Sequence, residues 1–526
     1  MQIHTRKGAL CLLPVVSALL VTFSFPPFDR GILAWLGLSP LLFALRQRGS
    51  LAAASLAFLF GCFFGIGAFY WAISINLIHP FKFLIVLIAF SLYFLAFGFL
   101  YRLISVGTGS WIIVGAPALW VALEYIRSNL FFLSFPWNLL GHSQYHCLPA
   151  IQIADITGVY GISFLIVMVN QVLSQIPDLL ITRRLAPTLT AGQAGGINWT
   201  AHLSTLALVL ALTFSYGWYK MVAPQGGEHL RVALVQANVL TRDNMPSADQ
   251  VEHLRAYERL TKEAARSKPD LIVWPASSLP APIDSSLLVH YIVGRLADET
   301  GAYLLVGSAG HEKSKPRKEG DLPYSNSEFL ISPHGYIKKQ YNKIRLLPFN
   351  ERLPLKGKIN WPQWITTLQK SFIPGKAYTL FQVSGARFGA PICWENLFPD
   401  LFRRFVREGA QFMVSVTNEG FFGRTSAPYQ TLAINVFRAV ENRVAIVRAA
   451  TTGVSGFINA NGEIVERVRG RSGEDLFVSG VLVWDVPLSN TKTFYTVYGD
   501  IFAYTVIGTA ALSLLISVCA QKWPRS

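Results

Sequence analysis

Eight apolar runs constrain this chain more than any other feature of its sequence. They lie near residues 8–25, 31–45, 51–78, 83–104, 111–127, 157–176, 202–219 and 502–519. A helix needs roughly 17 to 25 predominantly apolar residues to cross the hydrocarbon core of a bilayer. The second run is short enough to be a tilted or re-entrant segment. The first has no obvious small-residue cleavage site, which favours a retained span. We therefore predict a polytopic α-helical membrane domain of about eight spans.

The composition agrees with membrane spans. Of the 526 residues, 52% are hydrophobic and 14% charged, and the mean hydropathy is +0.38. A soluble protein of this size is ordinarily less apolar. The formal charge of +16 would suit a nucleic-acid partner, but we find no compact Lys/Arg stripe interleaved with exposed aromatic residues. The basic residues cluster beside the apolar runs, so we expect no nucleic-acid partner.

The positions of these basic residues predict the orientation of the chain, because short cytoplasmic loops carry an excess of Lys and Arg. Basic residues flank alternate ends of the predicted spans: Arg6, Lys7, Arg46, Arg48, Arg102, Arg183, Arg184, Lys522 and Arg525. Both termini are then cytoplasmic. Residues 1–223 form a membrane domain with seven spans, 224–495 an extracytoplasmic domain, and 496–526 a closing span with a short tail.

The polar domain alternates predicted strands with predicted helices, which is typical of a layered α/β fold. Strands are expected at 231–239, 271–275, 302–310, 387–393, 411–417 and 443–450, and helices near 247–267 and 285–299. Two segments, 327–341 and 454–468, read as hairpins with Pro-His-Gly and Asn-Gly at their turns. No internal repeat interrupts this pattern.

Cys393 is the only cysteine of this polar domain; the others are Cys11, Cys62, Cys147 and Cys519. This scatter shows no disulfide framework. A strand-end cysteine is more often a small buried hydrophobe than a nucleophile. An unpaired thiol outside the cytoplasm is nevertheless exposed to oxidation. We therefore treat Cys393 as a candidate nucleophile.

Five motifs give this cysteine its context. They are FPWNLLGHSQ at 135–144, YNKIRLLPFNERLP at 341–354, ICWEN at 392–396, TNEGFFG at 417–423 and TTGVSGFINANGEI at 451–464. Together with the order of spans, polar domain and closing span, they resemble the nitrilase superfamily and, within it, the apolipoprotein N-acyltransferase family. The resemblance covers essentially the whole chain. It implies an αββα sandwich for the polar domain.

The resemblance also implies a Glu-Lys-Cys triad, of which Lys343 and Cys393 match the lysine and the cysteine. The family's Trp-Pro-Glu motif reads Trp274-Pro275-Ala276 here. A methyl group cannot accept a proton, so turnover is expected to be severely impaired. Three explanations compete: a deliberate inactivating change, a naturally inactive relative, and a natural enzyme with another base. We favour the first, because every other motif is in place.

Two further carboxylates, Glu351 and Glu395, are expected near the cysteine, either to orient the site or to replace the missing base. Lys343 and the backbone N–H of Trp394 are the expected oxyanion donors. Substrate contacts are expected from Trp394, Phe349, Asn418, Phe421 and Phe422. Apolar residues expected at an acyl entrance, or else in the core, are Trp361, Trp364, Ile365, Leu368, Phe372, Leu397, Phe398, Leu401, Phe402, Phe421 and Phe422.

The activity implied by the resemblance is acyl transfer from a phospholipid, through a Cys393 thioester, to the N-terminal diacylglyceryl-cysteine amine of an apolipoprotein. The expected location is the bacterial inner membrane, with the polar domain in the periplasm. We expect a monomer that uses no metal and no cofactor. Two alternatives remain open: a catalytically dead lipid- or lipoprotein-binding protein, favoured by Ala276, and a membrane-tethered amidase.

Overall fold

The computed structural model describes residues 2–74, 79–177, 199–223, 227–240, 245–311, 324–362 and 371–522. The chain divides into two compact units, Met1–Ala223 with Tyr498–Ser526, and Pro224–Val497. Several residues used in the predictions lie outside the described parts of the chain: Arg183, Arg184, Trp364, Ile365, Leu368 and Arg525.

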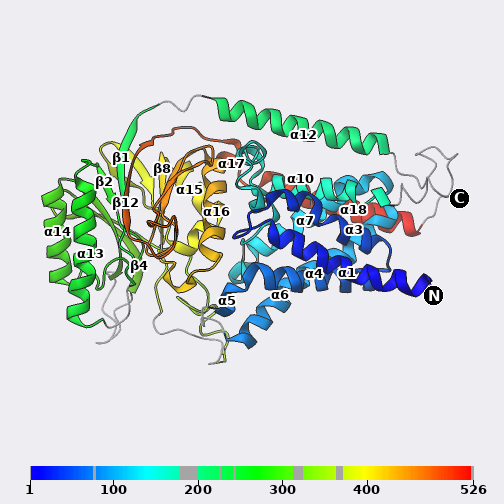
Figure 1. The fold of residues 1–526 in the computed structure, drawn as a ribbon, viewed down its shortest axis with the longest axis horizontal. Coiled ribbons are helices and arrows are strands. Elements are labelled where there is room, and N and C mark those ends of the chain that lie inside the picture. Colours follow the sequence, from blue (N-terminus) through cyan, green and yellow to red (C-terminus); the bar gives the residue numbers. More distant parts are fainter. Residues whose placement is uncertain are drawn as a thin grey trace. The chain divides into compact units, whose positions relative to one another are not determined.

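All regular elements among the described residues of the first unit are helices (Figure 1). Its elements are α1 (Gln2–Phe23), η1 (Gly31–Leu33), α2 (Ala34–Gly37), α3 (Ser39–Arg46), α4 (Ser50–Phe69), α5 (Trp71–Ser74), α6 (Pro80–Gly107), η2 (Gly109–Trp111), α7 (Ile112–Asn129), η3 (Phe131–Leu133), η4 (Leu140–Gln144), α8 (Leu148–Ile151), α9 (Ala154–Thr157), α10 (Val159–Leu173), α12 (Trp199–Val222) and α18 (Ile501–Lys522).

Within the described residues, five helical segments are long and apolar enough to cross a membrane: Ser50–Phe69, Pro80–Gly107, Gly109–Asn129, Trp199–Val222 and Ile501–Gln521. Three further apolar segments are shorter, Leu10–Phe23, Gly31–Arg46 and Val159–Leu173. All eight predicted runs therefore contain helices, and within the described residues five of the segments are long and apolar enough to cross a membrane. The count of eight spans stays a prediction.

The second apolar run is broken where α2 ends. Pro40 stands in the first turn of α3, where the proline ring would clash with the carbonyl of a continuous helix. The amide oxygen of Asn170, on α10, accepts hydrogen bonds from the backbone N–H groups of Leu38 and Ser39, both at 2.8 Å. The break therefore has a defined partner for its freed backbone donors.

The second unit is a four-layer αββα sandwich (Figure 1). One sheet has the order β12-β1-β2-β3-β4-β5 and the other β11-β10-β9-β8-β7-β6. The strands are β1 (His229–Gln236), β2 (Leu271–Val273), β3 (Tyr303–His311), β4 (Tyr324–Ile331), β5 (Ile337–Asn342), β6 (Phe381–Val383), β7 (Ala386–Gly389), β8 (Phe412–Thr417), β9 (Ala445–Ala450), β10 (Gly456–Ile458), β11 (Ile464–Arg467) and β12 (Gly480–Pro487). The helices are α13 (Ser247–Ala265), α14 (Leu287–Thr300), α15 (Pro399–Arg407), α16 (Ala427–Asn442) and α17 (Phe494–Tyr498), with η5 (Cys393–Leu397) and η6 (Gly420–Phe422).

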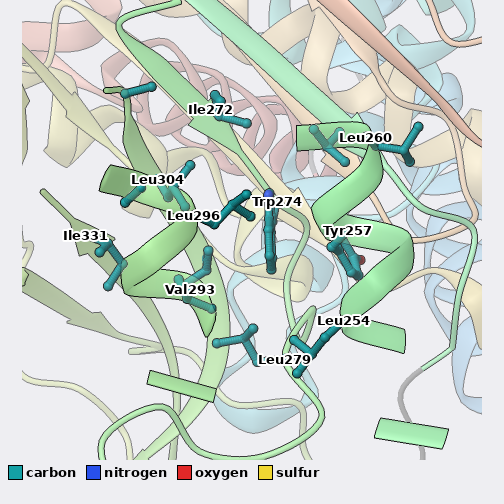
Figure 2. Close-up of a cluster of buried hydrophobic side chains, with 14 of the residues drawn as sticks. Leu254, Tyr257, Leu260, Ile272, Trp274, Leu279, Val293, Leu296, Leu304 and Ile331 are labelled. Atoms are coloured by element: carbon teal, nitrogen blue, oxygen red, sulfur yellow. The ribbon is translucent and has the colours of Figure 1, made fainter. Parts of the chain in front are cut away.

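A large hydrophobic cluster joins α13 and α14 to the first sheet. Trp274 lies at its centre, with its ring stacked on that of Tyr257 at a centroid distance of 4.5 Å (Figure 2). The indole N–H donates to the Thr261 hydroxyl at 3.0 Å, so the buried ring leaves no unsatisfied donor. This core fixes the end of β2, which leads directly into Ala276.

The opposite face of the first sheet meets the second sheet. Phe457 of β10 contacts Trp484 of β12 with ring centroids 5.4 Å apart. The Ser455 hydroxyl is hydrogen-bonded to the side chain of Gln236, at the end of β1. The two inner faces therefore form a second core, and side chains at the strand ends can approach one another from both sheets.

The prediction of a helical membrane domain joined to an αββα domain is confirmed in its architecture. One local prediction is wrong: Cys393 does not end a strand. β7 stops at Gly389, and Ile392 only forms an isolated bridge to Val416. Pro391 explains the early end, because proline has no N–H to donate to a sheet ladder.

Candidate active site

Cys393 opens the short helix η5 with a left-handed backbone, φ +52°. A non-glycine residue in this region is strained, and such strain is concentrated at functional sites. The residue is half-buried, and its thiol is hydrogen-bonded to the Thr417 side chain. Burial raises the pKa of the thiol, while the positive charge of Lys343 opposes that rise. The thiolate therefore depends on Lys343 for stabilisation.

Lys343 is anchored by Glu351. Its Nζ lies 2.9 Å from Oε1 and 2.8 Å from Oε2 of the carboxylate, and its side chain is only 2% exposed. Glu351 also accepts hydrogen bonds from the backbone N–H of Leu347 at 2.7 Å and from the Asn326 amide at 3.0 Å. Burial, the largest single effect, would lower the pKa of Lys343. The charges of Glu351, Cys393 and Glu395 and the hydrogen bond to Glu351 together outweigh it, so the pKa is raised. The ammonium is therefore a fixed positive charge beside Cys393.

Glu395 is completely buried and joins the end of β5 to the cysteine turn. Its carboxylate accepts hydrogen bonds from the Tyr341 hydroxyl at 2.9 Å and from the backbone N–H groups of Ile344 at 2.7 Å and Arg345 at 3.0 Å. Its other oxygen accepts from the backbone N–H of Ile392 at 2.8 Å. Burial raises the pKa of Glu395, although these donors oppose the rise. The network holds two segments that are far apart in sequence.

A buried ion pair supports the opposite side of the cysteine. Arg448 donates to Oε1 of Glu419 at 2.6 Å, and the Thr431 hydroxyl donates to the same oxygen at 2.7 Å. Among the described residues, Oε2 of Glu419 has no hydrogen-bond partner. A Cβ at Gly453 would lie 2.0 Å from this oxygen, so glycine is required there. The charge of Glu419 contributes to the raised pKa of Cys393.

Ala276 lies in a bulge between β2 and the next hydrogen bonds to β3. The backbone N–H of Trp274 donates to Leu305 at 2.8 Å, and that of Leu279 donates to Gly307 at 3.0 Å. Between them Ser277 has φ +54°. Ala276 is buried, with 1% of its surface exposed. Its methyl group offers neither donor nor acceptor to the site.

Each residue expected to bind substrate contacts another side chain of the sandwich. Trp394 is half-buried and its ring packs edge-on against Phe398 at 5.7 Å. Phe349 contacts the Trp361 ring at 4.9 Å. The Asn418 amide oxygen accepts from the Thr451 hydroxyl at 3.0 Å. These contacts leave the substrate role of each residue a prediction.

Two groups of apolar residues near the site differ in exposure. Phe421 is 38% exposed, whereas Phe422, against whose ring it packs at 4.3 Å, is 7% exposed. The four apolar residues that follow the cysteine turn are all buried: Leu397, Phe398, Leu401 and Phe402. Their burial supports the core-packing interpretation for these four. Phe421 stays a candidate for an acyl entrance.

Sequence reasoning missed several residues that shape this site. Tyr341 and Asn326 orient the two glutamates, and Thr417 bonds the thiol. It also missed Glu328, a single carboxylate in the otherwise apolar end of β4. A charged residue among buried positions of a strand was the available signal.

A nucleophilic thiol beside a fixed cation, at the strand ends of an αββα sandwich, suits reactions that pass through an acylated cysteine. Residues 231–494 match the family model described as carbon-nitrogen hydrolase, which defines the class of this unit. An amidase from Nesterenkonia sp. has 19% sequence identity and a TM-score of 0.37, covering 50% of this chain and 93% of that structure.

The helical unit distinguishes one family within this class. Residues 17–172 match the model described as apolipoprotein N-acyltransferase N-terminal domain. The apolipoprotein N-acyltransferase of Geobacter metallireducens is 36% identical over 511 residues, covering 95% of this chain and 94% of that relative. The one of Chlorobaculum tepidum is 28% identical over 538 residues, covering 97% of each. The chain belongs to the apolipoprotein N-acyltransferase family.

Proposed function

We propose that this protein transfers an acyl chain from a phospholipid to the N-terminal amine of a diacylglyceryl apolipoprotein through a thioester on Cys393. The observation that carries the proposal is the buried Lys343 ammonium, which Glu351 holds beside the thiol. A fixed cation stabilises both a thiolate and the oxyanion of a tetrahedral intermediate. The membership of the chain in its family supports the choice of donor and acceptor.

The reaction has two half-reactions. The Cys393 thiolate attacks an ester carbonyl of the phospholipid, the S–C bond forms, and the C–O bond to the glycerol breaks. The lysophospholipid leaves after its oxygen takes a proton. The amine of the apolipoprotein then attacks the thioester, loses a proton, and releases the thiolate. We assign Lys343 and the backbone N–H of Trp394 to the oxyanion, and Phe349, Asn418, Phe421 and Phe422 to substrate contact.

Both half-reactions need a proton acceptor, and Ala276 cannot be one. Glu351 is occupied by the Lys343 ammonium, and Glu395 is surrounded by four donors. We therefore propose that both are positioning residues. Unless another group accepts the proton, the chain is an inactive form of its family.

We further propose that the protein is a monomer of the bacterial inner membrane, with the sandwich in the periplasm and both termini in the cytoplasm. The five full-length apolar helices support a membrane location. The distribution of Lys and Arg supports this orientation. A membrane-borne site avoids extracting an acyl chain from the bilayer, at about 0.8 kcal/mol for each methylene.

The test is acylation of a synthetic diacylglyceryl lipopeptide by the full-length protein in phospholipid micelles. The chain, its Ala276→Glu variant and its Cys393→Ala variant are compared by mass spectrometry of the peptide. We expect Ala276→Glu to acylate the peptide and Cys393→Ala not to. If Ala276→Glu forms neither a thioester nor product, the proposed function fails.

A second candidate function is a binding protein without turnover, which Ala276 favours. Lipopeptide binding by the unaltered chain, measured by its retention in lipid nanodiscs, separates the two. Binding without any thioester at Cys393 would support the binding protein. A membrane-tethered amidase would instead release ammonia from soluble amides.

A further inference from the structure

Glu328, on β4, is a buried carboxylate that the site described above does not use. Its side chain is 0% exposed, and among the described residues neither of its oxygens has a hydrogen-bond partner. An unsatisfied buried carboxyl is costly, so its presence calls for a reason. The usual reasons are an ordered water molecule and a role in chemistry.

Its position follows from the strand register. Glu328 lies opposite Gly307 of β3 and opposite Tyr341 of β5. The next residue, Phe329, belongs to the cluster under α13 and α14, as does Val306. Because successive residues of a strand point to opposite faces, Glu328 and Gly307 lie on the face toward the second sheet.

The segment that contains Ala276 lies against this face of β3. A Cβ placed on Gly307 would lie 2.7 Å from the Cα of Ala276 and 2.4 Å from the nitrogen of Ser277. Directly opposed residues of an antiparallel pair have Cβ atoms about 4.5–5.5 Å apart. The side chain of Glu328 therefore begins within one side-chain length of the Ala276 bulge, where the resemblance would place a carboxylate.

The neighbours of Glu328 on the same face connect it to the site. Asn326, two residues earlier on β4, donates to Glu351 at 3.0 Å. Tyr341, opposite on β5, donates to Glu395 at 2.9 Å. Glu351 holds Lys343, and Glu395 holds the turn that carries Cys393. Glu328 thus neighbours two residues that hydrogen-bond to glutamates of the site, whereas its own oxygens have no hydrogen-bond donor among the described residues.

We propose that Glu328 is the proton acceptor of this protein, supplied from β4 in place of the carboxylate missing at position 276. The inference rests on the proposed acyl transfer. The Cys393 thiol gives its proton to the Glu328 carboxylate, directly or through one water molecule. Sγ bonds the ester carbon, the ester C–O bond breaks, and Glu328 returns the proton to the departing lysophospholipid oxygen.

The second half-reaction uses the same group. Glu328 takes a proton from the attacking amine as the N–C bond forms and the S–C bond breaks. The released sulfur remains a thiolate beside the Lys343 ammonium or regains the proton from Glu328. Neither half-reaction is an oxidation or a reduction, and no further reactant is required.

The electrostatic setting suits this role. Burial raises the pKa of Glu328 well above its ordinary value. The titratable groups beside it are Tyr257 of α13, whose raised pKa reflects burial and then the charge of Glu328, and Tyr341, which lies opposite it on β5. The pKa of the thiol is also raised. A glutamate whose pKa is raised accepts a proton, once it is ionised, more readily than an ordinary glutamate does.

The experiment compares four full-length proteins in detergent micelles containing phosphatidylethanolamine and phosphatidylglycerol. They are the unaltered chain, Glu328→Gln, the double variant Ala276→Glu/Glu328→Gln, and Glu466→Gln, which changes an exposed glutamate of β11. Thioester formation at Cys393 and lipopeptide acylation are measured between pH 5 and pH 9, with the thermal unfolding midpoint as a check on folding.

We expect Glu328→Gln to lower the rate of thioester formation by at least about 10²-fold without lowering the unfolding midpoint. The double variant should recover activity. Its acid limb should lie at lower pH, because the resemblance places a carboxylate at position 276 in one triad with the Lys343 charge, and a nearby cation favours the ionised form. Glu466→Gln should behave as the unaltered chain. This rescue would not follow if Glu328 only filled space.

Three results would overturn the inference. An active chain whose Glu328→Gln variant is equally active uses another base, and the proposed function stands. An inert chain that gains activity in the double variant is an inactivated acyltransferase, so Glu328 is not a base. If the double variant is inert although folded, and the Ala276→Glu protein that is compared with Cys393→Ala is also inert, the proposed function fails and the inference fails with it.

Discussion

The ammonium of Lys343 lies within 2.9 Å of both oxygens of Glu351. A backbone N–H and a side-chain amide hold the same carboxylate from its other sides. The lysine is therefore unable to move away from Cys393 without abandoning a buried charge. A buried cation held in this way acts on the thiol as a permanent electrostatic partner.

The effect of the Lys343 charge on the Cys393 thiol can be tested directly. In the unaltered chain, the charge of Lys343 partly offsets the rise in the pKa of Cys393 that burial causes. Lys343→Met removes this charge, so the pKa of Cys393 should rise further. Alkylation of Cys393 by iodoacetamide at neutral pH should slow, about tenfold for each unit of pKa. The rate is measured on the Cys393 peptide by mass spectrometry, which excludes the other cysteines. Lys339→Met, an exposed change on β5, which ends just before Lys343, is the control. Equal rates in both variants would contradict the prediction.

Glu395→Gln should destabilise the sandwich. The carboxylate accepts from one hydroxyl and three backbone N–H groups, whereas the amide nitrogen of glutamine would face donors. Leaving a buried donor unsatisfied costs about 1–3 kcal/mol. We expect a lower thermal unfolding midpoint and a slower thioester step. An unfolding midpoint equal to that of Glu466→Gln would rule out the structural role of this network.

Loss of the ion pair between Arg448 and Glu419 is expected to reduce the free energy of unfolding more than Glu395→Gln does. Arg448→Met removes the partner of a fully buried carboxylate. Breaking a buried pair from one side costs about 3–5 kcal/mol. Chemical denaturation of the full-length protein in detergent, followed by tryptophan fluorescence, measures the loss. Partial recovery in Arg448→Met/Glu419→Gln is expected, since the uncompensated charge is then absent; no recovery would show that packing, not charge, dominates.

The raised pKa of Glu328 predicts the pH dependence of stability. The folded state keeps the carboxyl proton to a higher pH than the unfolded chain does. Stability from this group is therefore full below the unfolded pKa and decreases as the pH rises toward the folded value. Glu328→Gln should remove the decrease and gain stability relative to the unaltered chain between pH 5 and pH 8. Parallel stability curves for the two proteins would disprove it.

Much of the fold was predictable because its signals are local. Apolar runs gave the helices, and the hairpins at 327–341 and 454–468 appear as β4 with β5 and β10 with β11. The missed strands are β6 and β12, and the missed helices include α15 and α16. β12 is an edge strand with half-buried residues, so its pattern lacks the continuous apolar character of β8 and β9.

The site was predictable only in part, because its parts come from distant segments. Lys343, Glu351, Cys393 and Glu395 were predicted from motifs, and the structure joins them through hydrogen bonds and charge. Glu328 lacks a motif, and its importance depends on a neighbour on β3 that only the register reveals. The left-handed backbone of Cys393 was equally hidden, since it follows from the turn after Pro391.

The strand that opens the sandwich and the strand that closes it are paired. His229 of β1 lies opposite Pro487 of β12, and the backbone N–H of Leu488 donates to Glu228 at 2.9 Å. The first and last strands of this domain are therefore neighbours, as in an inserted cassette, and the chain runs on through α17 before the unit ends at Val497. Such a cassette can be acquired or exchanged as a unit, because its host needs to supply only two neighbouring attachment points. The same pairing makes the sandwich from β1 to β12 a suitable domain to insert into another protein.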